Sequence, residues 1–99
     1  MLTCLCQIER KNITETCYHD DSFCHNATMC KVDLEFSDGV EIWHHNCVYD
    51  EDRLDCRSLL QSHISKCCDW DKCNEKVNKF YYSFSGDYNG LYFLFDSNL

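Results

Sequence analysis

The sequence contains no proline, only three glycines and few basic residues. Its 9 Lys and Arg face 17 Asp and Glu, which gives a net charge of −8. The basic residues are scattered, whereas a surface that faces phosphates needs a basic stripe. We therefore expect no nucleic-acid partner. No repeat, low-complexity tract or proline-rich linker divides the 99 residues.

Long apolar runs are also missing. The run Leu91–Phe95 has five residues, and a membrane-spanning helix needs roughly twenty. It belongs to a cysteine-free, aromatic-rich tail, Glu75–Leu99. Asn89-Gly90 is a pair that favours a tight turn, so this tail either forms a small hairpin or stays flexible and prone to aggregation. The sequence leaves both alternatives open.

Cysteine, in contrast, is abundant. The chain has ten, an even number that permits full pairing. A chain this short buries a marginal core, and cysteine at this frequency is typical of a disulfide scaffold in an oxidising compartment. Asn-Xaa-Thr sequons at Asn12 and Asn26 agree with secretion. We therefore expect an extracellular glycoprotein.

The pattern of side chains predicts strands. Leu2–Ile8 is a short apolar run that carries Cys4 and Cys6 at positions on the same face of a strand. Met29–Phe36 alternates, with one apolar face and one charged face. The apolar face is Cys30, Val32, Leu34 and Phe36, and the charged face is Lys31, Asp33 and Glu35.

A long β-hairpin is expected next. Ser37-Asp38-Gly39 follows the alternating strand, and Asp-Gly is preferred where a two-residue turn needs positive φ. Val40–Tyr49 then forms the returning strand. Between Cys56 and Cys67 the periodicity changes, and residues 57–64 fit one or two helical turns that need bridges at both ends.

The most specific motif is the segment CCDWDKCN, which runs from Cys67 to Asn74. Adjacent cysteines point to opposite sides of an extended chain, so they start two separate bridges. A bridge from Cys68 to Cys73 would close a tight loop and leave Cys67 to reach back along the chain.

The cysteine ladder as a whole resembles the ectodomains of the activin and transforming-growth-factor-β receptor family. The matching features are Cys4-x-Cys6, the spacings Cys24 to Cys30 and Cys47 to Cys56, and the CC-x4-CN box. The resemblance covers Thr3 to about Asn74 and is closest to the type I, bone-morphogenetic-protein-like receptors. Asn74-Glu75-Lys76 is also similar to the type II activin receptors, so both types stay open.

The resemblance implies a small disulfide-rich, mainly β fold of the three-finger, snake-toxin-like class with a short helical turn. Residues 3–74 would be the ligand-binding ectodomain, and residues 75–99 a tail with no assigned domain. The implied bridges are Cys4–Cys30, Cys6–Cys17, Cys24–Cys47, Cys56–Cys67 and Cys68–Cys73. Spacing alone does not choose among the many possible pairings.

The resemblance also implies a ligand-binding surface. In type I relatives it combines the palm of the central finger with a hydrophobic knob just before the cysteine that opens the helical turn. The corresponding residues are Leu54 as the knob, Asp55 as its polar neighbour, Leu59 and Leu60 beside them, and Ile42 and Trp43 on the palm. Apolar anchors of this kind dominate protein–protein affinity. Leu59 and Trp43 are equally compatible with a place in the core.

The implied function is that of the extracellular ligand-binding domain of a receptor. Its partner would be an activin-like or bone-morphogenetic-protein-like growth-factor dimer, and through this shared ligand a co-receptor of the other type. The parent protein would be a single-pass serine/threonine kinase receptor of the plasma membrane. The alternative is a secreted three-finger protein that acts as a decoy receptor or a toxin-like binder.

We expect no catalysis, cofactor or metal in this chain. There is no Cys-x-x-Cys pair for zinc or redox chemistry, and His44 and His45 would diverge on a strand. Ten paired cysteines leave no thiol nucleophile. No segment is similar to a nucleophile elbow or a paired-carboxylate site.

Overall fold

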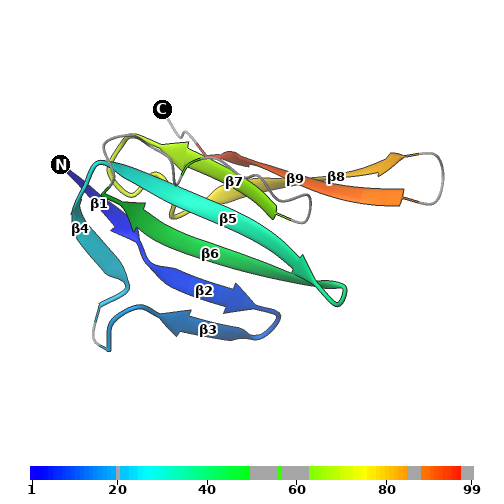
Figure 1. Ribbon diagram of the computed structural model, residues 1–99, viewed down its shortest axis with the longest axis horizontal. Coiled ribbons are helices and arrows are strands. Elements are labelled where there is room, and N and C mark those ends of the chain that lie inside the picture. Colours follow the sequence, from blue (N-terminus) through cyan, green and yellow to red (C-terminus); the bar gives the residue numbers. More distant parts are fainter. Residues whose placement is uncertain (20, 50–55, 57–62, 85–87, 97–99) are drawn as a thin grey trace.

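The computed structural model describes residues 1–19, 21–49, 56, 63–84 and 88–96 (Figure 1). These residues form nine strands: β1 (Leu2–Leu5), β2 (Gln7–Arg10), β3 (Ile13–Thr16), β4 (Phe23–Ala27), β5 (Met29–Ser37), β6 (Val40–Val48), β7 (His63–Cys68), β8 (Val77–Phe84) and β9 (Tyr88–Phe95). The fold is small, mainly β and disulfide-rich, as expected. Among the described residues, no helix has the length and apolar character needed to cross a bilayer.

The strands form one large and two small antiparallel sheets. The large sheet has the order β3-β2-β6-β5-β7, while β1 pairs with β4 and β8 pairs with β9. The hairpins β2–β3 and β5–β6 lie side by side and extend away from the end of the molecule that holds the N-terminus (Figure 1). The β8–β9 hairpin forms a second layer that projects beyond β7.

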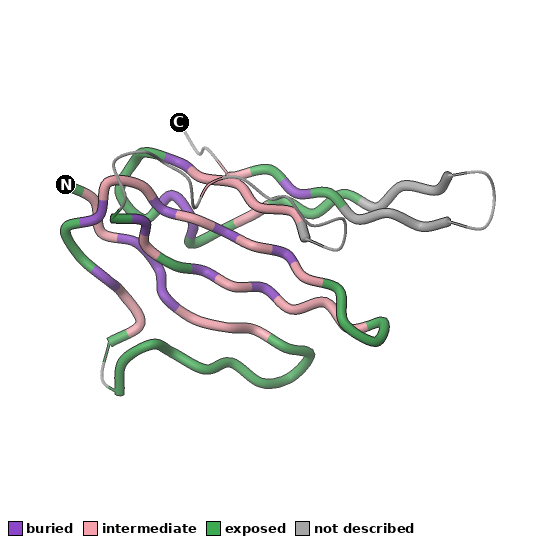
Figure 2. The backbone as a smooth tube through the Cα atoms, in the orientation of Figure 1, coloured by how far each residue is buried: buried purple, intermediate pink, exposed green. Residues whose placement is uncertain are grey.

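The central hairpin β5–β6 confirms the expectation from the alternating pattern. Ser37 pairs with Val40, and the two residues between them have positive φ, 52° at Asp38 and 76° at Gly39. This geometry is that of a type I′ turn, which suits the twist of the two strands. Buried positions alternate along β5 and β6 (Figure 2). The pattern is broken near the two ends of the hairpin, because Phe36 near the turn is 40% exposed and Val48 at the end of β6 is buried.

The first predicted strand is divided. Instead of one strand over Leu2–Ile8, β1 pairs with β4 and β2 pairs with β3 and β6. The chain changes sheet at Cys6, whose N–H donates to the carbonyl of Ser22 and whose carbonyl accepts from Cys17. Hydrophobic pattern does not say which strand pairs with which, so this break was not predictable from the run alone.

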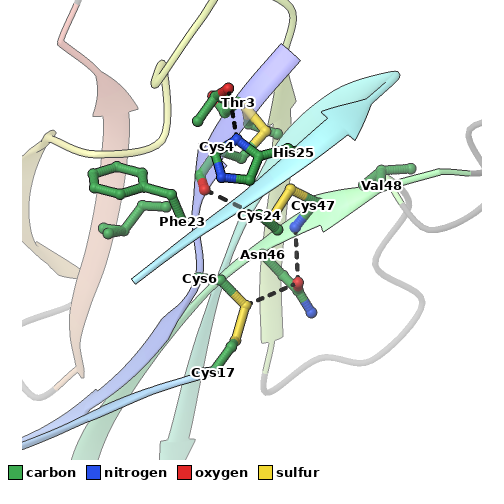
Figure 3. The surroundings of a disulfide bond; sticks show 12 residues. Thr3, Cys4, Cys6, Cys17, Phe23, Cys24, His25, Asn46, Cys47 and Val48 are labelled. Carbon is green, nitrogen blue, oxygen red and sulfur yellow. Dashed lines mark hydrogen bonds between the residues drawn. A yellow bond between two sulfur atoms is a disulfide. The ribbon is translucent and has the colours of Figure 1, made fainter. Parts of the chain in front are cut away.

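The ten cysteines form five pairs, and the part of the chain that the structure describes contains no free cysteine. The pairs are Cys4–Cys30, Cys6–Cys17, Cys24–Cys47, Cys56–Cys67 and Cys68–Cys73, which are the five that the resemblance implied. Their Cα atoms lie 5.4 to 6.2 Å apart, within the range for bridged cysteines. Figure 3 shows Asn46 beside two of the bridges, where its Oδ1 accepts from Cys47 N–H at 2.8 Å.

Two clusters of buried residues form the core. One consists of bridged cysteines, with Ala27 among them, at the end from which the hairpins extend. The other brings Val32, Leu34 and Trp43 of the large sheet together with Phe93 of β9. Phe95 packs against both clusters. The C-terminal hairpin is therefore part of the packed fold.

Of the two alternatives for the tail, the structure has the hairpin, but its turn was wrongly placed. Asn89 and Gly90 lie within β9, and Phe84 pairs with Tyr88, so the connection falls at residues 85–87. This register forms longer strands than a turn at Asn89-Gly90 would allow. It also directs Phe93 and Phe95 towards the large sheet, where they are buried or half-buried.

The prediction of helical turns over residues 57–64 is wrong for its last two residues. Residues 57–62 lie outside the described residues, whereas His63 and Ile64 belong to strand β7. Ile64 pairs with Leu34 and packs against the Phe93 cluster. Burial of this side chain in the sheet thus overrides a local pattern that favoured a helix.

Candidate functional site

The large sheet has two faces of different character. Successive residues of a strand point to opposite faces, and the register aligns these alternations across the sheet. One face, the covered face, holds Val32, Leu34, Trp43 and His45 under the β8–β9 hairpin. The opposite face, the palm face, carries Ile8, Arg10, Ile13, Glu15, Lys31, Asp33, Glu35, Ile42, His44 and Ser65.

Three isoleucines lie on the palm face, and Arg10 lies between two of them, Ile13 and Ile42. Ile8 pairs with His44 and Ile42 pairs with Arg10, so Ile8 and Ile42 lie diagonally across β2 and β6. Ile13 on β3 is 61% exposed, and the other two are half-buried. These side chains offer apolar surface that a partner can desolvate.

Several polar and charged residues of the palm face contact one another. Lys31 Nζ lies 3.3 Å from Asp33 Oδ2, and His44 Nε2 lies 3.0 Å from Glu35 Oε2. The hydroxyl of Ser65 donates to the other carboxylate oxygen of Asp33. Half-exposed pairs of this kind add little stability, about 0–1 kcal/mol each, but they fix the side chains beside the isoleucines.

The structure separates the two predicted palm residues. Ile42 lies on the palm face, whereas its neighbour Trp43 points to the covered face and is only 4% exposed. Its ring meets that of Phe93 edge to face, with the centroids 5.2 Å apart. Of the two readings that the sequence left open, Trp43 is therefore a core residue and does not lie on an open ligand-binding surface.

The remaining predicted ligand contacts, Leu54, Asp55, Leu59 and Leu60, lie outside the described residues. Their described neighbour Cys56 is bonded to Cys67 on β7. Cys67 pairs with Lys31, a palm-face residue, and Cys56 Sγ lies 4.0 Å from Met29 Sδ. The bridge thus places Cys56 itself at the palm side of the sheet.

Asn74 is a buried residue whose role the sequence did not reveal. Its Oδ1 accepts from Leu5 N–H at 2.8 Å, and its Nδ2 lies 2.9 Å from the carbonyl of Leu5, 3.1 Å from that of Lys31 and 3.2 Å from that of Asn46. The side chain therefore joins β1, β5 and β6. Its place directly after the last cysteine of the CC-x4-CN box was the only sequence signal for it.

His45 is the second buried polar residue missed by sequence reasoning. Its Nδ1–H donates to the carbonyl of Asn74 at 2.8 Å, and its Nε2 lies 3.5 Å from Glu9 Oε1. Burial lowers the pKa of His45 below its ordinary value, although the bond to Asn74 and the charge of Glu9 oppose this shift. The imidazole is thus held neutral. His45 lies two residues from Trp43 and two from Cys47, so the alternation of a strand puts all three side chains on one face of β6. This spacing was the sequence signal that could have identified His45 as a buried residue.

A third polar group lies at the surface near the disulfides. His25 Nδ1 is 3.2 Å from Thr3 Oγ1, and His25 Nε2 is 3.4 Å from Asp21 Oδ2 (Figure 3 shows the first of these). The hydroxyl, imidazole and carboxylate follow the order of a hydrolase triad, but both contacts are solvent-exposed and long. Their evident effect is to tie β1 to β4. Among the described residues, no three His, Cys, Asp or Glu side chains converge as metal ligands would.

Both predicted glycosylation sites are exposed. Asn12 lies in the turn between β2 and β3, and Asn26 lies in β4 with φ of 60°. Exposure is what an N-glycan requires, and the modification itself stays a prediction.

The arrangement as a whole combines an open, partly apolar sheet face with a disulfide-tied base. No family model, curated protein or solved structure matches this chain.

Proposed function

We propose that this chain is the extracellular ligand-binding domain of an activin- or bone-morphogenetic-protein-type receptor and that it binds a growth-factor dimer through its palm face. In this proposal the domain belongs to the type I class, and the chain itself performs no catalysis. The proposal rests on one combined observation: the ten cysteines pair as the resemblance implies, and the palm face carries apolar side chains that are exposed or half-buried.

The pairing supports the three-finger reading. The five bridges are those that the resemblance implies, and ten cysteines can pair in very many other ways. The order β3-β2-β6-β5-β7 is that of two adjacent hairpins followed by a single strand. In this proposal the two hairpins and β7 are the three fingers, and the β8–β9 hairpin is an addition to them.

The palm face supports the ligand-binding role. Ile8, Ile13 and Ile42 provide apolar anchors, while the paired charges around Asp33 and Glu35 provide a polar rim. Such a distribution is typical of protein–protein interfaces. The Cys56–Cys67 bridge holds Cys56 at the same side of the sheet. The proposal assigns Leu54, two residues before Cys56, and Ile42 to one binding surface.

An extracellular location is part of the proposal. Five disulfides are compatible with an extracellular or secreted domain, because such bridges persist in oxidising compartments.

The test is a binding experiment with refolded chain and a panel of activin-like and bone-morphogenetic-protein-like dimers. For the dimer that binds, Ile42→Ala and Leu54→Ala should each cost more than about 1 kcal/mol, which is at least about a fivefold rise in Kd. Surface plasmon resonance measures the change.

The matched control is Thr14→Ala, which alters an exposed residue on the opposite face of the same sheet; since Thr14 completes the Asn12 sequon, all variants are compared as refolded chain without N-glycans. Its Kd should equal that of the unchanged chain. If no dimer of either class binds, or if Thr14→Ala weakens binding as much as Ile42→Ala, the proposal is wrong.

A further inference from the structure

The two Asn-Xaa-Thr sequons differ in how the fold holds their three residues. An N-glycan is attached by a transferase that binds the asparagine carboxamide and the threonine hydroxyl of one sequon together. Both groups, and the residue between them, must therefore be able to leave the surface of the protein. Exposure of the asparagine alone does not decide whether a folded chain can be modified.

The sequon at Asn12 is open throughout. Asn12 lies in the turn between β2 and β3, and Ile13 and Thr14 are the first two residues of β3. All three are exposed, and Ile13 is exposed to 61%. Within the described residues, β3 pairs with β2 alone, at one edge of the large sheet. The end of this hairpin can open at little cost, because its opening removes no side chain from the core.

The sequon at Asn26 is fixed at two of its three residues. Asn26 itself is exposed, but Ala27 is fully buried in the cluster of bridged cysteines and pairs with Leu2 of β1. The hydroxyl of Thr28 donates to the carbonyl of Val48 at 2.8 Å, and its N–H donates to the same carbonyl at 2.9 Å. The hydroxyl that the transferase must bind is therefore already used within the fold.

Two disulfides hold the ends of this segment. Cys24 precedes the sequon by two residues and is bonded to Cys47, a bridge that Figure 3 shows. Cys30 follows the sequon by two residues and is bonded to Cys4. Release of residues 26–28 would have to remove Ala27 from the core and separate β4 from β1 while both ends stay tied. Opening of this kind approaches the free energy of global unfolding.

The fold nevertheless accommodates a glycan that is already attached to Asn26. The side chain is exposed, and the residue has a φ of 60°, a conformation that asparagine adopts more readily than most residues. The structure thus permits the product at this position but hinders its formation.

We propose that Asn26 is N-glycosylated only before the disulfide-bonded fold has formed, whereas Asn12 is modified in the unfolded and the folded chain alike. Occupancy of Asn26 is then set by competition between glycan transfer and closure of the bridges at Cys24 and Cys30. This rests on the two predicted glycosylation sites. It goes beyond the proposed function, because it concerns the maturation of the chain and depends on no ligand.

The transfer step needs one co-reactant, a lipid-diphosphate-linked oligosaccharide. The carboxamide nitrogen of the asparagine attacks the anomeric carbon of the first sugar. The new N–C bond forms as the C–O bond to the diphosphate breaks, and the lipid diphosphate leaves with the bonding electron pair. An amide proton passes to a base of the transferase.

The test offers the full chain in two forms to a purified eukaryotic oligosaccharyltransferase with its lipid-linked donor. One form is refolded with its disulfides intact, and the other is kept reduced in dithiothreitol. Peptide mass spectrometry measures glycan transfer at each site. The reduced chain should be modified at both sites, and transfer to Asn26 should be at least about tenfold slower in the folded chain. Asn12 in the same molecules controls for the activity of the enzyme.

Two variants isolate the sites. Asn12→Asp and Asn26→Asp each leave a single sequon, and aspartate also tolerates the φ of 60° at position 26. In the folded form, Asn26→Asp should accept one glycan and Asn12→Asp should accept none. Reduced Asn12→Asp that has been glycosylated at Asn26 should then refold and form five disulfides, which circular dichroism and the intact mass establish.

Equal rates of transfer to Asn26 in the folded and reduced chains would overturn the dependence on folding. Absence of transfer to Asn26 in the reduced chain would overturn its assignment as an acceptor. Absence of transfer to Asn12 in the folded chain would show that this sequon is not open. Failure of the chain glycosylated at Asn26 to refold would contradict the room that the structure leaves for a glycan there.

Discussion

At the scale of single residues, Asn74 and His45 connect elements that are distant in the sequence. Asn74 contacts backbone groups of β1, β5 and β6, and its own carbonyl accepts from His45. Every buried side-chain nitrogen or oxygen of the described residues has a partner. Because an unsatisfied buried group costs about 1–3 kcal/mol, these two residues stabilise the fold only as a complete network.

The neutral state of His45 makes stability depend on pH. The folded-state pKa lies below the unfolded value of about 6.5, so the unfolded chain binds more protons and stability is lost as the pH falls through and below 6.5. The slope from this one group is at most about 1.4 kcal/mol per pH unit. Urea unfolding at about 25 °C, repeated at pH values from about 5 to 8, measures how the free energy of unfolding changes with pH.

The comparison with His45→Gln isolates this residue from the four other histidines. The variant should be less stable at neutral pH and should show a smaller loss on acidification. An identical pH dependence in the two proteins would contradict the assignment of a neutral, buried imidazole.

At the scale of elements, the C-terminal hairpin completes the core of the large sheet. Its inward positions hold Val77, Phe93 and Phe95, while its outward positions hold Phe80, Tyr92 and Leu94, which are 41 to 49% exposed. Lys66 of β7 lies 3.9 Å from the Tyr92 ring centroid and donates to its hydroxyl. The tail's aromatic side chains that the structure describes thus divide between a buried and an exposed face, as the alternation of a strand requires.

Phe93→Ala should therefore destabilise the whole protein. The side chain is fully buried against Val32, Leu34 and Trp43, and truncation of such a residue costs about 3–5 kcal/mol. Chemical unfolding with the disulfides intact measures the free energy of unfolding, and Trp43 makes fluorescence a suitable signal.

Leu94→Ala is the matched control from the same strand. Leu94 is 45% exposed, so its loss should cost less than about 1 kcal/mol. Similar costs for the two variants would mean that the hairpin does not pack on the large sheet in solution.

At the scale of the whole molecule, the five bridges close loops with sequence separations of 26, 11, 23, 11 and 5. Removal of one native bridge from a small domain costs about 2–5 kcal/mol. Total stabilities of folded proteins are about 5–15 kcal/mol, so the loss of all five exceeds what a domain of this size can tolerate.

Reduction and alkylation should consequently unfold the chain. Mass spectrometry of the native protein should show ten fewer hydrogens than the reduced form, in agreement with ten paired cysteines. Circular dichroism should show loss of the β-sheet signal after alkylation. A reduced chain that keeps its sheet signal and its tryptophan fluorescence would contradict the scaffold described above.

Patterns that act within one segment were predictable from the sequence. The alternation of Met29–Phe36 and the Asp38-Gly39 pair predict the central hairpin, because side-chain period and turn conformation are local properties. The abundance of cysteine predicts a disulfide scaffold on the same compositional grounds. Ile42 was named as a candidate surface residue only through the family resemblance, which named the buried Trp43 beside it as well.

Tertiary structure decided what depends on contacts between distant segments. The division of the first strand at Cys6, the turn of the C-terminal hairpin and the burial of Trp43 all follow from pairing and packing partners that no local pattern names. One strand has two faces, and only the element that packs on it determines which face becomes core. The sequence by itself determined a disulfide-stapled β protein, and the docking of Phe93 determined which face of its sheet became core.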